Sequence, residues 1–309
     1  MKVFTKESLI AELKNICNSG WVRSHKKPGN DGAVGNALER LLGIPENNLP
    51  LPNAAEWEIK GQRRGTSLLT LFHMDPSPRA MRLIPRLLLP KYGWPLRDSE
   101  HEKSFRLTIG TAPSNDRGFR VIVDDTIGRV AISFNAAQVG ENQQEWLRTV
   151  EERVGLGELD PQPYWGFNDL EHKAGTKLKN LFYILADSKI QEGVEYFWYN
   201  GIIMLQTFDF DHFLNALRAG TMKIDFDARS GRGRRGHNHG TKFRIHRDLF
   251  PSMYGQVTRI LDEPLSPLVL AQRIDTEIAI TTDKPFEGNV VNTKKGTLLS
   301  QLPLIEGEN

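Results

Sequence analysis

Cysteine is almost absent from this chain of 309 residues, because Cys17 is the only one. A lone cysteine excludes an intramolecular disulfide and every zinc or iron–sulfur site that needs several cysteine ligands. Long apolar runs are missing too: no stretch approaches the length of a membrane span, and residues 1–15 lack the apolar centre of a secretion signal. We therefore expect a cytoplasmic protein with no membrane partner, in which Cys17 packs as a small apolar side chain in a helix.

A large net charge is also lacking. The 40 lysines and arginines nearly balance the 38 acidic residues, which leaves a formal net charge of +2. The distribution is less even, because residues 63–97 contain a series of arginines with Asp75 as their only acid, and residues 232–247 contain no acid at all. A surface that faces phosphates needs this kind of local positive excess and does not need a high overall charge.

Apolar periodicity and turn residues outline a mixed fold without repeats or low-complexity tracts. Helices are predicted after Thr5 up to Gly20, over 33–42 before Gly43, over 168–178 and in "DFDHFLNALRAG". Strands are predicted at 56–60 and 67–72, in "FRVIVDD", "RVAISF" and "LFYILADS", and on both sides of "SGRGRRGHNHG". The segment "GWVRSHKKPGNDGAVG" is predicted as a basic loop. This order of elements predicts helices packed on a mixed sheet, an α/β or α+β fold.

Charged and apolar side chains alternate in "EWEIK", residues 56–60. In a strand, Glu56, Glu58 and Lys60 share one face, and Trp57 and Ile59 share the other. One interpretation is an ordinary strand with its apolar residues buried and its charges in water. The other is a metal site, because Mg²⁺-dependent phosphodiester hydrolysis needs hard oxygen ligands, and a nearby lysine can orient the attacking water and offset phosphate charge.

The metal-site interpretation assigns a role to each position around Glu58. Glu58 supplies a carboxylate, the Ile59 carbonyl adds a neutral oxygen, and Lys60 lies beside the attacking water. Further ligands are expected from the turn before the strand, at Asn53, and from the polar side of the preceding helix, at Glu39.

The segment "ARSGRGRRGHNHGTKFRI" at 228–245 is the second candidate site. It can be a solvated basic hairpin, a zinc site through His237, His239 and His246 that lacks a nearby fourth ligand, or a DNA-recognition element. Taken alone, the segment favours the solvated hairpin. Glycines let a backbone approach the duplex closely, and arginines bind phosphates or guanine bidentately, so we favour DNA recognition given the candidate nuclease motif upstream at Glu58 and Lys60. The candidate DNA-binding residues are Arg63, Arg64, His73, Arg232, Arg234, Arg235, His237, His239, Lys242 and Arg244. For Arg63 and Arg64 a solvated turn is the alternative, and for His73 a structural histidine.

Two blocks far apart in the chain carry a resemblance to a known family. Glu39 in "GNALERLLG" is followed in order by Pro52-Asn53, Glu58-Ile59-Lys60 and "SLLTLF", and "GHNHGTKFRI" follows at 236–245. This order resembles the MvaI/BcnI family of type II restriction endonucleases, which are related to the MutH nicking endonuclease within the PD-(D/E)xK nucleases. The resemblance covers roughly residues 5–255.

The resemblance implies a PD-(D/E)xK mixed sheet flanked by helices, with a DNA-recognition lobe. It implies an endonuclease domain over 1–255, with a catalytic lobe around 30–75 and 165–215 and a recognition segment around 225–250, and an extension of unknown role at 256–309. By resemblance, Glu39, Asn53 and Glu58 face Mg²⁺ and Lys60 is the catalytic lysine. The implied activity is hydrolysis of double-stranded DNA at a short GC-rich near-palindrome such as CC-N-GG. A monomer would cut one strand per binding event, and a cognate DNA methyltransferase would belong to the same system.

Asn53 departs from the family pattern, which has Asp at this position. An amide oxygen can coordinate a metal but brings no negative charge, so the affinity for Mg²⁺ should fall. Three explanations stay open: compensation by Glu56 or Glu39, a naturally weakened nuclease, or an engineered Asp-to-Asn change. Two alternative functions follow. One is a MutH-like repair nickase with the same active site, and the other is a sequence-specific DNA-binding protein that does not cut.

Overall fold

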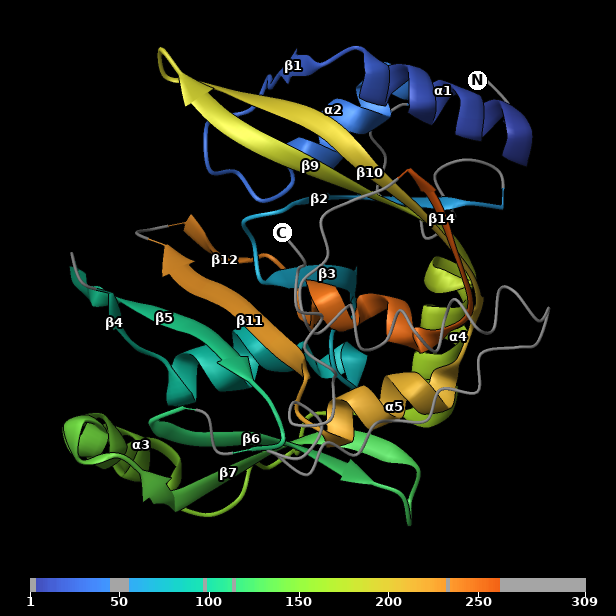
Figure 1. The fold of residues 1–309 in the computed structure, drawn as a ribbon. Helices are drawn as coiled ribbons and strands as arrows, with labels where there is room; N and C mark the ends of the chain where they lie inside the picture. Colours follow the sequence, from blue (N-terminus) through green and yellow to red (C-terminus); the bar gives the residue numbers. More distant parts are fainter. Residues whose placement is uncertain (1–3, 45–55, 97–98, 113–114, 232–233, 262–309) are drawn as a thin grey trace, which may run out of the picture.

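A computed structural model describes residues 4–44, 56–96, 99–112, 115–231 and 234–261. The strands within these residues form three sheets. Figure 1 shows one sheet in the upper part of the molecule, next to the two N-terminal helices, and the other two below it. No helix among the described residues is long and apolar enough to cross a membrane.

The five-stranded sheet carries the "EWEIK" stretch. It has the order β1-β10-β9-β2, and β14 also pairs with β10. Within it, β9 and β10 form a long antiparallel hairpin, and β2 lies parallel to β9 at the edge of the sheet. The strands are β1 (Trp21–Arg23), β2 (Glu58–Arg63), β9 (Asn180–Gln191), β10 (Val194–Phe208) and β14 (Tyr254–Leu261).

Helices α1 (Lys6–Asn18) and α2 (Ala33–Leu42) cover one face of this sheet. Thr5 caps α1 as predicted, because its side chain accepts from the Ser8 N–H while the Ser8 hydroxyl bonds back to the Thr5 backbone. Gly43 ends α2 with a φ of 70°, a left-handed conformation that glycine adopts readily. α2 lies close on β2, since a Cβ on Gly61 would be 3.3 Å from the Gly35 Cα.

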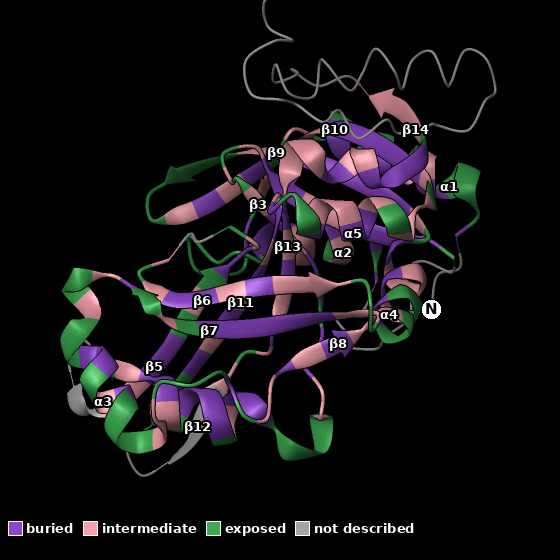
Figure 2. Cartoon of the chain, turned by 90° about the horizontal axis from the view of Figure 1, so that it is seen from below, coloured by how far each residue is buried: buried purple, intermediate pink, exposed green. Residues whose placement is uncertain are grey.

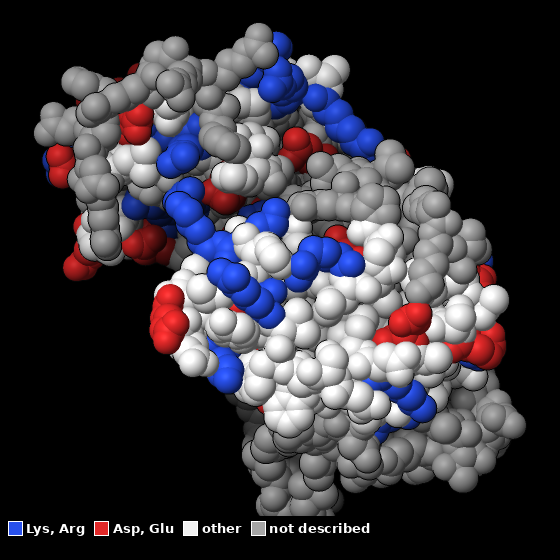
Figure 3. Space-filling model, turned by 90° about the horizontal axis from the view of Figure 1, so that it is seen from above, with Lys and Arg blue, Asp and Glu red and all other residues white. Residues whose placement is uncertain are grey.

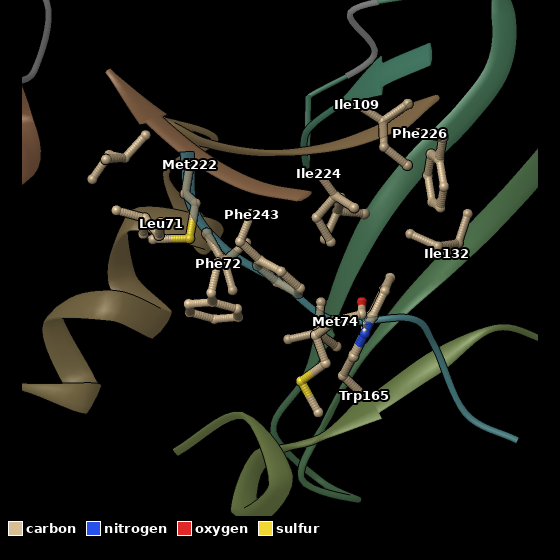
Figure 4. Packing of buried hydrophobic residues seen from close by; sticks show 14 of the residues in the cluster. Leu71, Phe72, Met74, Ile109, Ile132, Trp165, Met222, Ile224, Phe226 and Phe243 are labelled. Atoms are coloured by element: carbon tan, nitrogen blue, oxygen red, sulfur yellow. Dashed lines mark hydrogen bonds between the residues drawn. The ribbon is translucent and has the colours of Figure 1, made fainter. Parts of the chain in front are cut away.

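The six-stranded sheet carries the basic, glycine-rich segment. Its order is β3-β13-β11-β5-β4, with β12 paired to β11. At its centre, the Phe243 ring lies 5.1 Å from Phe72, 5.3 Å from Trp165 and 6.0 Å from Phe213, measured between ring centroids (Figure 4). The strands are β3 (Leu68–His73), β4 (Trp94–Leu96), β5 (Ser99–Ile109), β11 (Met222–Gly231), β12 (Arg234–Asn238) and β13 (Lys242–His246).

The third sheet has the order β6-β7-β8, from β6 (Arg117–Asp124), β7 (Arg129–Val139) and β8 (Tyr164–Gly166). One core cluster joins all three sheets, and a second lies between the five-stranded sheet and its two covering helices, so buried residues run through the centre of the molecule (Figure 2). The remaining helices are α3 (Gln144–Val154), α4 (Phe167–Leu178), α5 (Phe210–Arg218), the π-helical η2 (Ile84–Tyr92) and three short 3-10 segments, η1 (Arg79–Met81), η3 (Glu141–Gln143) and η4 (Arg247–Met253).

The predicted fold class is confirmed, and the structure adds detail to it or changes the bounds of single elements. The strand predicted at 56–60 runs from Glu58 to Arg63, because Gly61 and Gln62 continue the pairing with β9. Part of the predicted basic loop forms β1 by pairing with β10. β2 and β3, which both fall in the range 30–75, belong to different sheets. Finally, β14 continues the five-stranded sheet past the boundary expected at 255.

Candidate active site

Glu58 is buried, although its side chain is ionisable. The residue is 4% exposed, and its carboxylate oxygens lie 2.9 Å from Lys60 Nζ and 3.5 Å from Lys177 Nζ. A buried carboxylate is unfavourable unless it is paired, and here two ammonium groups provide the pairing. Trp57 and Ile59 are buried on the other face, as the ordinary-strand interpretation predicted. The ordinary-strand interpretation is wrong for Glu58, because this charge does not lie in water.

Lys177 was not among the predicted site residues. It lies in the last turn of α4, and α4 leads directly into β9. Leu181 near the start of β9 pairs with Glu58, so the pairing of β2 with β9 carries Lys177 to a carboxylate 119 residues away in the sequence. Lys173 precedes Lys177 by one helical turn and lies on the same side of α4. The only sequence signal for Lys177 was the pair of lysines spaced one turn apart on this helix.

The electrostatic field around Glu58 is positive. Burial, followed by the charges of Lys177 and Arg79, lowers the pKa of Lys173 below its ordinary value, and Glu58 opposes this shift. Burial, followed by the charges of Lys242 and Lys60, also lowers the pKa of His73, and Asp75 opposes that shift. His73 ends β3 and pairs with Lys242 in β13. It is therefore influenced by charges from both the Glu58 site and the six-stranded sheet.

Glu39 lies in α2, on the Ile59 side of β2. Arg63 bonds the Asn30 carbonyl just before α2, and Gly61 faces Gly35, so α2 runs from the Arg63 end of β2 toward the Glu58 end. Glu39 follows Gly35 by one turn and is partly buried. Glu39 therefore lies along β2, the strand that carries Glu58. Its helix packs on the face of the sheet opposite to the Glu58 side chain.

The predicted metal ligands are brought together only in part. Glu58, Ile59 and Lys60 are consecutive in β2, and Asn53 lies outside the described residues. Within the described part of the chain, no group of three or more His, Cys, Asp or Glu side chains is placed to hold a metal ion. The Glu58 carboxylate offers the hard oxygen that Mg²⁺ prefers, in a position where positive charge already compensates it. The full ligand set stays a prediction.

Arg63 and Arg64 have partners within the protein. Arg63 is 8% exposed and makes two bonds to the Glu195 carboxylate, of 2.7 and 2.9 Å, and one of 2.7 Å to the Asn30 carbonyl. Because this guanidinium is enclosed and paired, we do not retain it as a phosphate contact. Arg64 donates to the Asn200 side chain at 2.7 and 3.0 Å and lies 3.4 Å from Asp187.

Of the predicted DNA-reading residues, Lys242 and Arg244 lie on one polar face of the six-stranded sheet. Lys242 Nζ lies 3.6 Å from Asp225 and 3.7 Å from Asp227, and an Arg244 nitrogen lies 3.7 Å from Asp225. The sequence analysis did not assign these two acids, although "KIDFDAR" alternates as a strand with one polar face. The exposed His239 follows β12, while Arg234, Arg235 and His237 are described only as backbone positions of β12, and Arg232 lies outside the described residues.

Asp75 holds the connection between β12 and β13. Its carboxylate accepts bonds of 3.1 Å from both the N–H and the hydroxyl of Thr241, which is fully buried. Gly240 precedes it with a φ of 79° and lies against the His73 ring. The turn that carries His239 is therefore anchored directly beside His73.

An edge strand with a buried Glu-x-Lys pair, next to a second sheet with a basic hairpin, gives a mixed α/β fold of the restriction-endonuclease type. The model of the MvaI/BcnI restriction endonuclease family matches residues 10–254, and the chain belongs to this family.

Solved structures resemble the chain over most of its length. The complex of restriction endonuclease MvaI with its cognate DNA substrate is 23% identical, with a TM-score of 0.66, covering 84% of this chain and 100% of that one. MvaI in the absence of DNA is 22% identical, with a TM-score of 0.46 and the same coverage. Comparison with curated protein sequences gives no match.

Proposed function

We propose that this protein is a Mg²⁺-dependent endonuclease that hydrolyses double-stranded DNA at a short, GC-rich near-palindrome of the CC-N-GG kind. It acts as a cytoplasmic monomer that cuts one strand per binding event, alongside a cognate methyltransferase. Family membership supports cleavage of DNA, and the observation that carries the chemistry is the buried Glu58 carboxylate between Lys60 and Lys177.

The residues around Glu58 divide the work of the reaction. A bound Mg²⁺ supplies charge neutralisation and a more acidic water, with Glu58, Asn53, Glu39 and the Ile59 carbonyl as its proposed ligands. Lys60 is partly exposed, with 20% of its side-chain surface accessible, so its ammonium can reach both Glu58 and an incoming phosphate. It orients the attacking water for in-line displacement at phosphorus. Lys173 and Lys177 extend the positive field for the scissile phosphate.

The polar face of the six-stranded sheet is the proposed reading surface. Lys242 and Arg244 offer donors, which suit guanine O6 and N7, and Asp225 offers acceptors, which suit the cytosine amino group. His73 and His239 lie next to this face, at either side of the turn that Asp75 anchors. Seen from above, Lys and Arg side chains gather across the middle of the molecule (Figure 3).

Digestion of supercoiled plasmid with Mg²⁺ tests this function. The protein should give discrete cuts that pass through a nicked circle, and Lys60→Ala should remove them, because loss of one positioned donor that stabilises transition-state charge costs about 100- to 1,000-fold. Lys14→Ala, on the remote α1, is the control. If Lys60→Ala cleaved the plasmid as the unmodified protein does, the assignment of Lys60 as the catalytic lysine would be refuted.

A second candidate function follows from Asn53. An amide in place of a carboxylate weakens a Mg²⁺ site, and a protein with a disabled site would bind one sequence without cutting it. The same digestion with Asn53→Asp separates the two. Cutting by that variant alone would identify this chain as a disabled form. Absence of cutting by both, with a discrete footprint on DNA, would establish a binding protein.

A further inference from the structure

The face of the five-stranded sheet that carries Glu58 and Lys60 continues beyond the end of β2. The β9–β10 hairpin extends past β2 and pairs with β1 near its tip (Figure 1). Strand alternation and register place Asp187 and Lys189 of β9 on the Glu58 face, together with the β10 and β1 residues opposite them. We call the outer group the platform; it consists of Trp21, Arg23, Lys189, Tyr196 and Trp198.

The platform exposes large aromatic side chains. Trp21 is 41% exposed and Trp198 is 40% exposed, and their rings lie 6.0 Å apart at an interplanar angle of 52°. The Lys189 ammonium lies 4.4 Å from the centroid of Trp21 and 6.0 Å from that of Tyr196. Trp198 Nε1 donates a 3.3 Å bond to the Cys17 carbonyl, which fixes its ring. Adjacent, ordered and exposed tryptophans are typical of binding surfaces.

Charge indicates which partner fits. Arg23 and Lys189 are exposed, and the loop after β1 adds the exposed Lys26 and Lys27. Two acids of this hairpin have partners within the protein: Asp187 lies 3.4 Å from Arg64, and Glu195 is buried against Arg63, while Glu192 is exposed at the hairpin tip. A surface of aromatic rings bordered by the exposed cations Arg23 and Lys189 suits a chain of phosphates and sugars.

The distance between the platform and the Glu58 site indicates which part of a bound duplex the platform would contact. Lys60 pairs with Tyr183, and Lys189 lies six residues farther along β9, which is about 20 Å at about 3.3 Å per residue. That length equals about six base-pair steps of B-DNA, at about 3.4 Å each. A duplex whose scissile phosphate lies at Lys60 therefore reaches the platform only if it continues well beyond a short recognition site.

We propose that the platform binds the sugar–phosphate backbone of the DNA that flanks the recognition site. Lys189 and Arg23 contact phosphates, and the two indole rings pack against deoxyribose. The contact raises affinity and carries no sequence information, because it does not reach base edges. This inference rests on the proposed function, since it assumes that the Glu58 site holds a DNA duplex.

The test measures DNA affinity by fluorescence anisotropy, without divalent ions, on two duplexes centred on the cleavage site mapped by plasmid digestion. One duplex has about 3 base pairs of flank on each side and the other about 12, chosen to end before the platform or to pass it. The variants are Lys189→Ala and the double variant Trp21→Ala/Trp198→Ala. Ile190→Ala is the matched control, because Ile190 is 64% exposed and adjacent in β9 but lies on the opposite face.

We expect the tryptophan variant to bind the long duplex about tenfold more weakly, a usual effect of truncating an interface tryptophan, and to bind the short duplex unchanged. For the long duplex, Lys189→Ala should reduce the slope of the logarithm of the binding constant against the logarithm of the salt concentration by about 0.9, which corresponds to the loss of one phosphate contact. Ile190→Ala should match the unmodified protein. Trp21→Phe/Trp198→Phe keeps the rings and should retain most of the affinity, which separates lost contacts from misfolding.

Equal losses on both duplexes, or no loss on the long one, would overturn the platform while leaving the nuclease intact. If the unmodified protein bound neither duplex, the proposed function itself would fail. The two failures are therefore distinguishable in one experiment.

Discussion

The guanidinium of Arg63 and the carboxylate of Glu195 form a buried two-bond ion pair, of 2.7 and 2.9 Å, that ties β2 to the neighbouring hairpin. The same pair holds the exposed loop after β1, because Arg63 also bonds the Asn30 carbonyl, and the Gly29 N–H donates to Glu195 at 3.3 Å. An arginine that directly follows the Glu58–Lys60 stretch in sequence thus serves as an internal anchor.

Removing one partner of this pair should destabilise the fold strongly. Glu195→Gln leaves the Arg63 charge buried and unpaired, and loss of one partner of a buried ion pair costs about 3–5 kcal/mol. Urea unfolding measures the change. Arg63→Met/Glu195→Met should recover part of the loss, because neither charge then remains. If Arg63→Met kept full stability but lowered the salt dependence of DNA binding, Arg63 would be a phosphate contact after all.

Lys177 should matter for cleavage, although it lies outside the Glu-x-Lys motif. Lys177→Ala removes the ammonium at 3.5 Å from Glu58 and leaves the pairing with Lys60 at 2.9 Å. A hydrogen bond to a charged group is worth about 1.5–3 kcal/mol, so the single-turnover rate should fall about 10- to 100-fold. Lys179→Ala is the matched control, since Lys179 is exposed at the end of the same helix. Equal effects of both variants would indicate a general charge effect and no role at Glu58.

His73 should titrate below its ordinary pKa of 6.5, because burial and the charges of Lys242 and Lys60 disfavour its protonated form. The unfolded chain then binds the proton more tightly, so the contribution of His73 to stability is present above pH 6.5 and is lost as the pH falls through the lower folded pKa. Urea unfolding as a function of pH measures this loss, and His73→Asn should reduce it.

DNA should reverse that shift. A phosphate near Lys60 and Lys242 offsets their charges, so NMR titration should show a higher His73 pKa in the complex than in the free protein. For the urea unfolding measured against pH, His25→Asn is the control variant, because His25 is exposed in the loop after β1. A His73 pKa at or above 6.5 in the free protein would contradict the described field.

Asp225 should limit binding to wrong sequences. Asp225→Asn removes the carboxylate near Lys242 and Arg244, so non-specific affinity should rise while discrimination at one base pair weakens by about 1–3 kcal/mol. Competition between the mapped site and its single-base variants measures the discrimination. Asp211→Asn, an exposed change on α5, should leave it unchanged. Preserved discrimination in Asp225→Asn would remove this residue from the reading surface.

Elements whose signals are local were predictable from the sequence. The Thr5 cap and the Gly43 C-terminus act over a few residues, and α1 and α2 lie where these signals place them. β1 was missed because a three-residue strand has no periodicity of its own and exists through pairing with β10. β14 was missed for the same reason, since its pairing with β10 is non-local.

The sequence by itself determined that Glu58 and Lys60 share a face, because side chains alternate along any strand whatever it pairs with. It also determined the local excess of positive charge around 228–245. Only the tertiary structure decided that Glu58 is buried and meets Lys177, because this contact requires the parallel pairing of β2 with β9. The same holds for Arg63, whose role depends on Glu195 in a distant strand. A charge becomes a ligand, an anchor or a contact according to what surrounds it, and that environment is built from segments far apart in the chain.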